Sequence, residues 1–524
     1  MKRRAAGYWM PISILLMVLL VGFLPSSWIL NFGKSQSSPE FKVGSKAFTE
    51  NVILGDLVKL IAKSENIAVE HQAEIQGTQI VFQYLVTDAI DVYPEYIGTI
   101  RYEILKDRNI VTEEEVRTAM LERFNLVMTK PIGFENTYAM GMLESRADEL
   151  GITKVSQLAS RVNLSYSLGQ EFVEREDGWE KMSATYGIDI PKPNGNDHAL
   201  TYKQLESGSA DVIDIYSTDS KIQTLDIRVL EDDLNFFPSY DAVFLYRKEL
   251  EEENPQLVKL IKSFEGKIDN RQMINLNARC EVDNKFEAEV AQEFLSDQMQ
   301  IDVEIETPSI VKDIFKNTVQ HLDLVRMSLI ACIIVAIPLG VIAAKQKLIG
   351  QAVLGTIGVL QTIPGIALLV MLIAPTEWFG RNLVGTKGLG ASVIPVVIAL
   401  FIYSLLPVVR NTYTGLTMIP GNLLESADAL GLTRWAKLWR IELPLALPSI
   451  LSGIKTAAII NVGFACLGAM IGAGGFGQPI FSGVRLSDTN LILQGAIPAA
   501  VLALMVQGVF EIIERILVPK GLKA

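Results

Sequence analysis

The 524 residues carry 59 acidic and 47 basic side chains, and the resulting net charge of −12 argues against nucleic acid as a partner. With 49% apolar and 20% charged residues, the chain is more apolar than a soluble protein usually is. Residues 41 to 307 mix charged and apolar side chains, whereas after Arg326 the charges stand in short clusters between long uncharged intervals. The sequence therefore predicts a soluble domain followed by a membrane domain.

The chain begins with three basic residues, Lys2 to Arg4, and continues with a charge-free stretch from Ala5 to Gly33. A cleaved signal peptide is one interpretation, but the stretch is long and has no clear small-x-small cleavage site. We favour an uncleaved membrane anchor over residues 1–34. The basic residues would then stay inside the cell and place residues 41–307 on the outer side.

The soluble part opens with "FKVGSKAFTENVILGDLVKLIA", in which a strand-like run leads through Gly44 into a helix with an apolar face. Such alternation continues to residue 307 and predicts α/β organisation. Lys46 stands just before this first helix, whose free amides and positive dipole end, capped by Thr49, favour an anion. A lysine that is merely solvated is the alternative.

Long uncharged intervals in the second part are the candidates for membrane spans, since about 18 to 25 residues cross a bilayer. An all-α membrane domain over residues 308–524 with five spanning helices is predicted. Alternating these spans from the outside places Lys345, Lys347, the segment 410–455 and the tail with Lys520 and Lys523 in the cytoplasm, as the positive-inside rule expects. The five intervals are 327–344, 348–376, 388–409, 456–484 and 489–510.

Between the third and fourth intervals the chain reads "ESADALGLTRWAKLWRIELP", residues 425 to 444. Its apolar positions fit two short amphipathic helices broken at Gly431. Such a pair can dock into a groove on a partner or lie on lipid, and the residues alone leave both alternatives open.

A resemblance favours docking. Six residues of this loop, at 410–447, match the spacing of the coupling-loop signature of bacterial ABC importer permeases, with Ser426 at the second signature position: Glu425, Ala427, Gly431, Ile441, Leu443 and Pro444. The resemblance implies that the loop inserts into an ATP-hydrolysing subunit. Because the chain has no G-x-x-x-x-G-K-[ST] phosphate loop, ATP and Mg are expected on a separate ATPase, in two copies on a permease homodimer.

Five stretches of the soluble part resemble, in order, the binding proteins of osmoprotectant importers, which take glycine betaine, proline betaine, carnitine or choline. This resemblance implies a two-lobed clamshell of the type II binding-protein fold, with lobe A at 41–135 and 239–307 and lobe B at 136–238. The stretches are "DVYPEYIGT" at 91–99, "GFENTYAM" at 133–140, "EREDGW" at 174–179, "IYSTDSKI" at 215–222 and "DDLNFFPSYDAV" at 232–243.

The resemblance also assigns binding residues. A quaternary ammonium donates no hydrogen bond and is held by aromatic faces, at about 0.5 to 2 kcal/mol per ring. The ammonium box falls to Tyr96, Tyr138, Tyr216 and Tyr240, and the carboxylate grip to Lys46, Arg175 and Thr99. Tyr93 is expected to be structural, and the alternative for Arg175 is a salt bridge with Glu174, Glu176 or Asp177.

Departures from the family pattern at Ile97, at Glu135 and in a short segment after Thr99 leave the choice of solute open. Catalysis and metal binding are not expected, because His71, His198 and His321 stand far apart in the sequence and the three cysteines are scattered.

The sequence thus predicts a multi-pass protein of the bacterial cell membrane that fuses the substrate-binding and permease subunits of an ABC importer, with glycine betaine or proline betaine as the favoured solute. It is not expected to be an enzyme. Choline, carnitine or ergothioneine transport, or an osmolyte receptor without transport, are the alternatives.

Overall fold

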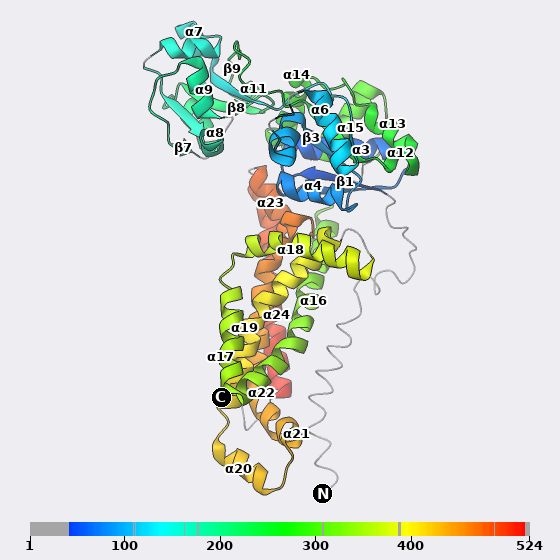
Figure 1. Ribbon diagram of the computed structural model, residues 1–524, viewed down its shortest axis with the longest axis vertical. Helices are drawn as coiled ribbons and strands as arrows, with labels where there is room; N and C mark the ends of the chain where they lie inside the picture. Colours follow the sequence, from blue (N-terminus) through cyan, green and yellow to red (C-terminus); the bar gives the residue numbers. More distant parts are fainter. Residues whose placement is uncertain are drawn as a thin grey trace. The chain divides into compact units, whose positions relative to one another are not determined.

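The computed structural model describes residues 41–518 except positions 108, 111, 162, 176–177, 197, 306–308, 386–388 and 487. The predicted anchor at 1–34 and the tail from Lys520 lie outside the described residues. The chain divides into two compact units, and each is described by itself (Figure 1). The first unit comprises residues 39–306 with 485–487, and the second comprises residues 307–484 and those from 488 onward.

The first sheet of the first unit has the strand order β2-β1-β3-β10-β4. Strand β1 runs parallel to β2 and β3, whereas β10 runs antiparallel to β3 and β4. Because parallel neighbours need a crossover, helices α3 and α4 connect β1 to β2 and β2 to β3. The bounds are β1 Phe41–Lys46, α3 Thr49–Ser64, β2 Val69–Ile75, α4 Thr78–Val86, β3 Val92–Tyr96, β4 Leu126–Met128 and β10 Ala242–Arg247.

The second sheet has the order β7-β6-β8-β5-β9 and is built from the middle of the unit. Strand β6 is parallel to β7 and β8, and β5 is antiparallel to β8 and β9. Its elements are β5 Tyr138–Leu143, α7 Glu144–Leu150, β6 Tyr166–Gly169, α8 Gln170–Glu174, α9 Trp179–Tyr186, β7 Gly195–Asn196, α10 His198–Glu206, β8 Val212–Tyr216, α11 Lys221–Thr224 and β9 Ile227–Val229.

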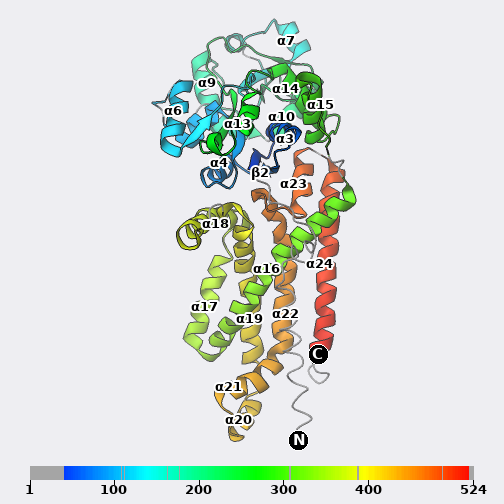
Figure 2. The same cartoon turned by 90° about the vertical axis from the view of Figure 1, so that its right-hand side faces the viewer.

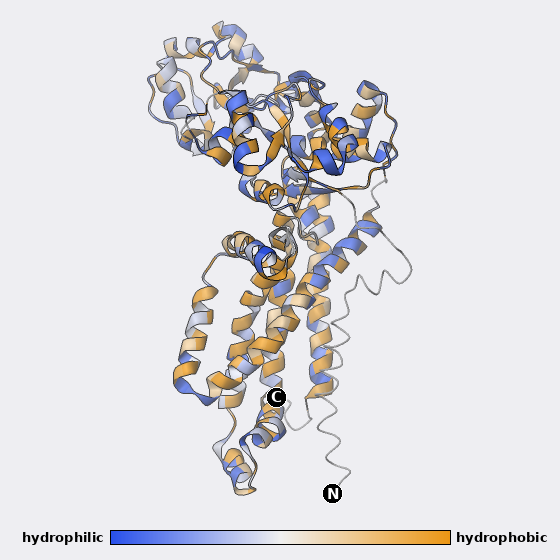
Figure 3. Cartoon of the chain, turned by 45° about the vertical axis from the view of Figure 1, so that its right-hand side comes forward, coloured by the Kyte–Doolittle hydropathy of each residue, from blue (hydrophilic) through white to orange (hydrophobic). Residues whose placement is uncertain are grey.

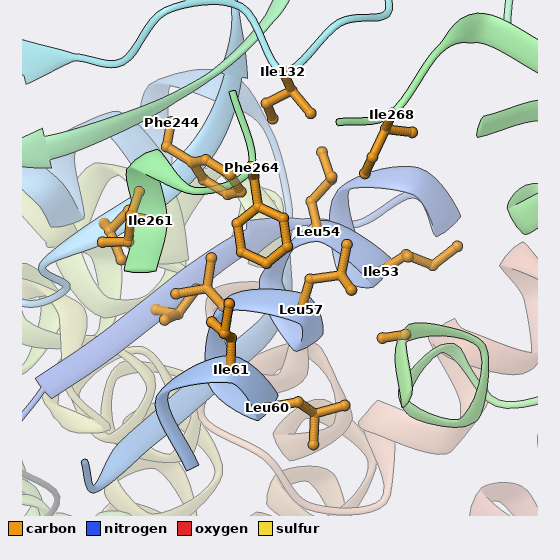
Figure 4. Packing of buried hydrophobic residues seen from close by; sticks show 14 of the residues in the cluster. Ile53, Leu54, Leu57, Leu60, Ile61, Ile132, Phe244, Ile261, Phe264 and Ile268 are labelled. Atoms are coloured by element: carbon orange, nitrogen blue, oxygen red, sulfur yellow. The ribbon is translucent and has the colours of Figure 1, made fainter. Parts of the chain in front are cut away.

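Each sheet has its own hydrophobic core. Around the first, the apolar face of α3 with Leu54, Leu57 and Ile61 packs against Phe244 of β10 and Phe264, as Figure 4 shows. The helices α13 (Pro255–Lys262), α14 (Asn270–Glu281) and α15 (Glu287–Met299) complete this core. Around the second sheet, the core contains the buried ring of Trp179. Two separate cores define two lobes.

The chain passes between the lobes twice, and the two crossings run side by side. Phe134 accepts a backbone hydrogen bond from Ala242 at 3.0 Å, and Tyr240 accepts one from Asn136 at 3.1 Å. Such a narrow, two-stranded connection is the kind of segment that serves as a hinge between packed lobes.

The second unit is helical, with five helices among the described residues that are long and apolar enough to cross a membrane. Figure 3 shows the hydrophobic residues that cover them, and Figure 2 shows α16, α19, α22 and α24 running along one another. The candidate spans are Ile310–Lys345, Gly365–Val384, Ile394–Thr417, Arg434–Ile471 and Thr489–Leu517. Their helices are α16 Ile310–Lys345, α18 Gly365–Phe379, α19 Ile394–Thr417, α22 Leu443–Phe464 and α24 Thr489–Leu517.

The predicted interval 348–376 is not one helix. Helix α17 (Lys347–Leu360) ends before Pro364, and α18 starts at Gly365, because the proline has no amide and disfavours helix in the residue before it. The 14 residues of α17 rise about 21 Å, less than the roughly 30 Å of a bilayer core.

The predicted interval 456–484 is also divided. The long helical segment that contains α22 ends at Ile471, and a separate helix, α23, spans Gly477–Arg485. Between them, Gly472, Gly474 and Gly475 adopt positive φ angles of 76°, 73° and 82°, a region that L side chains avoid.

The predicted helix pair of the loop is present. Helix α20 (Gly421–Ala429) and helix α21 (Arg434–Lys437) flank Gly431, which has a φ of 71°. A π-helical turn, Leu438–Glu442, then leads into α22. The break at Gly431 thus lies where the sequence placed it, in a conformation that glycine adopts at little cost.

Candidate functional site

A cavity of about 400 Å³ lies in the first unit, and both sheets and the crossings contribute to its wall. All seven residues that the family resemblance nominated line this cavity: Lys46, Tyr96, Thr99, Tyr138, Arg175, Tyr216 and Tyr240. They come from sites spread over almost 200 positions of the sequence, and the fold brings them to one place.

The stretch Asp91 to Thr99 forms β3 and the short helix α5 (Ile97–Thr99) that follows it. Alternation along the strand sends neighbouring side chains in opposite directions, and Tyr93 is fully buried whereas Tyr96 lines the cavity. Gly98 lies against the ring of Tyr240, so close that a Cβ atom on residue 98 would be 2.5 Å from it. The glycine therefore makes room for the Tyr240 ring.

Lys46 is not simply solvated. Its Nζ atom pairs with Glu95 Oε1 at 2.5 Å and lies 5.0 Å from the centre of the Tyr96 ring and 5.5 Å from that of Phe48. Burial raises the pKa of Glu95, and the charge of Lys46 opposes that rise. The lysine charge therefore faces the cavity next to an aromatic ring, but it is partly balanced by a carboxylate.

The predicted cap of the first helix is wrong. Helix α3 already includes Thr49, and its N-cap is Phe48, whose extended backbone has no side-chain capping bond. The side chain of Asn51, in the first turn of α3, connects the helix to two strands. Its Oδ1 accepts a hydrogen bond from the Lys46 amide of β1 at 2.6 Å, and its Nδ2 donates to the Pro94 carbonyl of β3 at 2.9 Å.

Tyr138 and Tyr216 are cross-strand partners of β5 and β8. Their ring centres are 4.8 Å apart, their hydroxyl oxygens are 3.1 Å apart, and Phe172 packs behind Tyr138 with ring centres 5.0 Å apart. Direct cross-strand neighbours of this kind hold each other's orientation. The pair presents two fixed aromatic faces from the second sheet.

Arg175 follows α8 and reaches across to the return crossing. Its Nη2 donates to the Tyr240 hydroxyl at 2.9 Å, and its guanidinium carbon lies 5.5 Å from the centre of the Tyr138 ring. Its Nη1 is 3.6 Å from a carboxylate oxygen of Glu103. Of the acids that the alternative interpretation named, Glu176 and Asp177 lie outside the described residues.

Sequence reasoning missed several polar residues of the cavity wall, among them the deeply buried Glu50, at 2% exposure. Its carboxylate accepts hydrogen bonds from Tyr96, Asn136 and Asn277. Burial raises the pKa of Glu50, and these donors oppose the rise. An acid in the first turn of a helix is an ordinary surface feature, so the sequence gives no signal that this one is buried.

His198, which stands far from the other histidines in the sequence, lies beside Tyr216, with ring centres 4.9 Å apart. Its two ring nitrogens are each 3.5 Å from a carboxylate, of Asp214 on one side and Asp219 on the other. Burial by itself would lower the pKa of this imidazole, but the two carboxylates raise the pKa to about 9. His198 is therefore charged at neutral pH and is balanced by two acids.

The wall thus combines four tyrosine rings, the basic side chains of Lys46, Arg175, His198 and Arg485, and buried acceptors. Among the described residues, no group of three or more histidine, cysteine or acidic side chains could hold a metal ion. This arrangement can enclose a small charged molecule by its shape and charge.

In the second unit, the six signature residues lie between α20 and the start of α22. Glu425 and Gly431 are exposed, Ala427 is buried, and the remaining three are half-buried. Next to them, Lys345 at the end of α16 pairs with the buried carboxylate of Glu442 at 2.6 Å. The end of the loop is therefore tied directly to the first candidate span.

Two lobes around one cavity, joined to a polytopic helical unit, define a binding protein fused to a membrane permease. Two family models match the chain, and they divide it in the same way. A "substrate binding domain of ABC-type glycine betaine transport system" matches residues 39–297, and a "binding-protein-dependent transport system inner membrane component" matches residues 336–521.

Two relatives are similar to parts of this chain. The glycine betaine/carnitine/choline transport system permease protein OpuCB of Bacillus subtilis (strain 168) is 38% identical over 40% of this chain and 91% of its own length. The ergothioneine transport permease/ergothioneine binding protein EgtU of Helicobacter pylori (strain G27) is 30% identical over 54% of this chain and 51% of its own length.

The chain therefore belongs to the osmoprotectant ABC importer family, as a substrate-binding domain fused to its permease domain. The family resemblance, the fold class and the multi-pass membrane location are confirmed. A solved structure described as a glycine betaine/carnitine/choline ABC transporter is 26% identical, covers 50% of this chain and all of its own, and has a TM-score of 0.48.

Proposed function

We propose that this protein binds a zwitterionic quaternary-ammonium osmolyte, glycine betaine or proline betaine, in the cavity of its first unit and carries it into the cell. The observation that carries the proposal is that all seven nominated residues line one cavity. We assign the functional parts as an anchor at 1–34, a binding domain at 41–307 with lobe A at 41–135 and 239–307 and lobe B at 136–238, and a permease domain at 308–524.

The cation end of the solute has four tyrosine rings available to it. Tyrosine faces attract a quaternary ammonium through their quadrupoles and add no competing charge. Tyr138 and Tyr216 come from the second sheet, Tyr96 from the first, and Tyr240 from the return crossing. A bound cation would thus contact both lobes and the hinge, which favours the closed clamshell.

The carboxylate end would be bound by Lys46, Arg175 and the half-buried Thr99. Arg175 offers a planar pair of donors that fits a carboxylate. Both basic residues already have an acidic neighbour, Glu95 for Lys46 and Glu103 for Arg175. A solute carboxylate therefore shares these donors with the protein's own acids.

Transport needs an energy source, which we place on a separate ATPase subunit that carries ATP and Mg. The loop with Glu425, Gly431 and Pro444 would dock into that subunit, and its exposed apolar side chains Leu430, at 79%, and Trp435, at 71%, suit a protein groove. A permease of five spans would work as a homodimer with two ATPase copies.

Other solutes of the same class are the second candidates. Choline lacks a carboxylate and would leave Lys46 and Arg175 without their role, which argues against it. Carnitine and ergothioneine carry both groups, and a relative named for ergothioneine transport and binding is 30% identical over 54% of this chain. A solute panel decides among them.

Calorimetric titration of the full chain in lipid nanodiscs with glycine betaine, proline betaine, carnitine, ergothioneine and choline tests the binding step. We expect the two small betaines to bind most tightly. Uptake of radiolabelled betaine into proteoliposomes that also contain the ATPase tests transport. Binding without ATP-dependent accumulation would identify a receptor instead.

A further inference from the structure

The carboxylate of Glu50 is an unusual feature of the cavity wall. It belongs to the first turn of α3, is 2% exposed and lines the cavity. Its Oε1 accepts a hydrogen bond from the Tyr96 hydroxyl at 2.5 Å and from Asn136 Nδ2 at 3.1 Å, and its Oε2 accepts one from Asn277 Nδ2 at 3.4 Å. Burial raises the pKa of Glu50, and the donors on both of its oxygens oppose this rise by favouring the ionised form.

No cation balances this charge in the described part of the chain, where Glu50 has hydrogen-bond donors but no ion-pair partner. The basic groups that face the cavity are each balanced by other acids. Lys46 pairs with Glu95, Arg175 lies near Glu103, and His198 lies between two aspartates. Arg485, which also lines the cavity, pairs with Glu74 and Glu287. Glu50 is therefore a buried carboxyl group with hydrogen-bond donors but no ion-pair partner among the described residues, and a cation bound in the cavity would supply one.

The hydrogen bond to Tyr96 connects this carboxylate to the box. A phenol that donates to a carboxylate gains electron density on its ring, and the carboxylate is held at the Tyr96 hydroxyl in a buried site of low dielectric constant. Both effects make the face of Tyr96 more attractive to a cation. Asn136 and Asn277 hold the carboxylate in this position.

We infer that Glu50 is the counter-charge for the ammonium end of the solute and acts through Tyr96, as a positioning residue that sets how strongly the box prefers cations. This inference deepens the proposed function and rests on it. It implies a specificity rule. Glu50 should increase the affinity for a cation without a carboxylate more than the affinity for a zwitterion, because ionised Glu50 also repels the carboxylate of the zwitterion.

The test compares three probes on the full chain in nanodiscs: tetramethylammonium, choline and glycine betaine. Glu50→Gln keeps the shape and removes the charge. We expect it to weaken tetramethylammonium and choline by about tenfold or more, and glycine betaine by a clearly smaller factor. Glu252→Gln is the matched control, since Glu252 is exposed and does not line the cavity, and it should change none of the three affinities.

Tyr96→Phe provides the second arm, because it keeps the ring and removes only the hydroxyl that contacts Glu50. It should also weaken tetramethylammonium more than betaine, and Glu50→Gln should have a smaller effect in the Tyr96→Phe background than alone. If Glu50→Gln does not fold, Tyr96→Phe carries the same comparison by itself.

Equal weakening of all three probes would show that Glu50 has a purely structural role and would overturn the inference. Unchanged tetramethylammonium binding in either variant would overturn it as well. If the unmodified protein binds no quaternary ammonium probe at all, the proposed function fails first, and that outcome is distinct from a failure of the Glu50 assignment.

Discussion

Gly98 offers a precise way to disturb one ring of the proposed box without touching that ring. A Cβ atom on residue 98 would lie 2.5 to 2.6 Å from three ring atoms of Tyr240. Ordinary carbon contacts are about 3.5 to 4.0 Å, so in Gly98→Ala the Tyr240 ring has to withdraw by roughly 1 Å. Gly98 is part of a short helix and does not have a positive φ angle, so alanine meets no backbone strain.

The expected loss of affinity follows from the contacts of that ring. One cation–π contact is worth about 0.5 to 2 kcal/mol, and 1.4 kcal/mol corresponds to about tenfold in Kd. Displacing the ring also stretches the 2.9 Å hydrogen bond between Tyr240 and Arg175. We therefore expect Gly98→Ala to weaken glycine betaine by about 3- to 30-fold, with a stability loss of about 1 to 3 kcal/mol from overpacking.

Calorimetry on the full chain in nanodiscs measures the affinity, and thermal unfolding measures the stability. The decisive control is the same substitution in a Tyr240→Ala background, where the added methyl group meets no ring and should have almost no further effect on Kd. An unchanged betaine affinity in folded Gly98→Ala would refute the assignment of Tyr240 to the box.

Three other predictions concern single side chains. Arg175→Ala should weaken glycine betaine far more than choline, because only the betaine has a carboxylate to lose; equal losses by calorimetry would argue against a carboxylate grip. The folded-state pKa of His198, about 9, lies above the ordinary value near 6.5, so its contribution to stability is fully present below about pH 6.5 and is lost as the pH rises through 9. Wild type should therefore exceed His198→Gln in unfolding free energy by an amount on the order of 3 kcal/mol at pH 6, and the difference should shrink by pH 10; a constant difference in urea titrations would contradict this. Glu442→Gln breaks the buried pair with Lys345 and should reduce betaine uptake per ATP hydrolysed in proteoliposomes, whereas an unchanged ratio would show that the pair does not transmit loop movement.

The pairing of strands that are far apart in the sequence determines much of the site geometry. Local sequence patterns do not show this pairing. Tyr138 and Tyr216 face each other because β5 and β8 pair antiparallel with those two residues in register, 78 positions apart. An alternating pattern shows which face of a strand is buried, but it does not give the register between two strands. Only the family resemblance placed these rings together in advance.

The ion-pair partners of the charged residues could not be predicted from local sequence patterns either. The sequence shows Lys46 before a helix, but not that Glu95, 49 positions away, pairs with it. Glu50 carries no mark of burial, since acids in the first turn of a helix are common on surfaces. Such pairings depend on which strand lies next to which, and therefore on the whole fold.

Two breaks in the apolar intervals have signals in the sequence that hydropathy does not show. The interval 348–376 contains "TIPG", and a proline followed by glycine is a turn signal that indicates a break in the apolar run. The "GAGGFG" run at 472–477 marks the end of the next long helix in the same way. Hydropathy shows only that a segment is apolar. The positions where the helices end depend on the backbone preferences of proline and glycine.

The energetics of the proposed box explain why a zwitterion fits it better than a simple cation. Four rings at about 0.5 to 2 kcal/mol each supply about 2 to 8 kcal/mol, whereas a micromolar Kd needs about 8 kcal/mol after the cost of ordering the lobes. The rings alone therefore reach micromolar affinity only at their upper limit. On the proposed function, a carboxylate bound by Arg175 and Lys46 would add charge-assisted hydrogen bonds from both lobes, and closure of the clamshell would then depend on both ends of the solute.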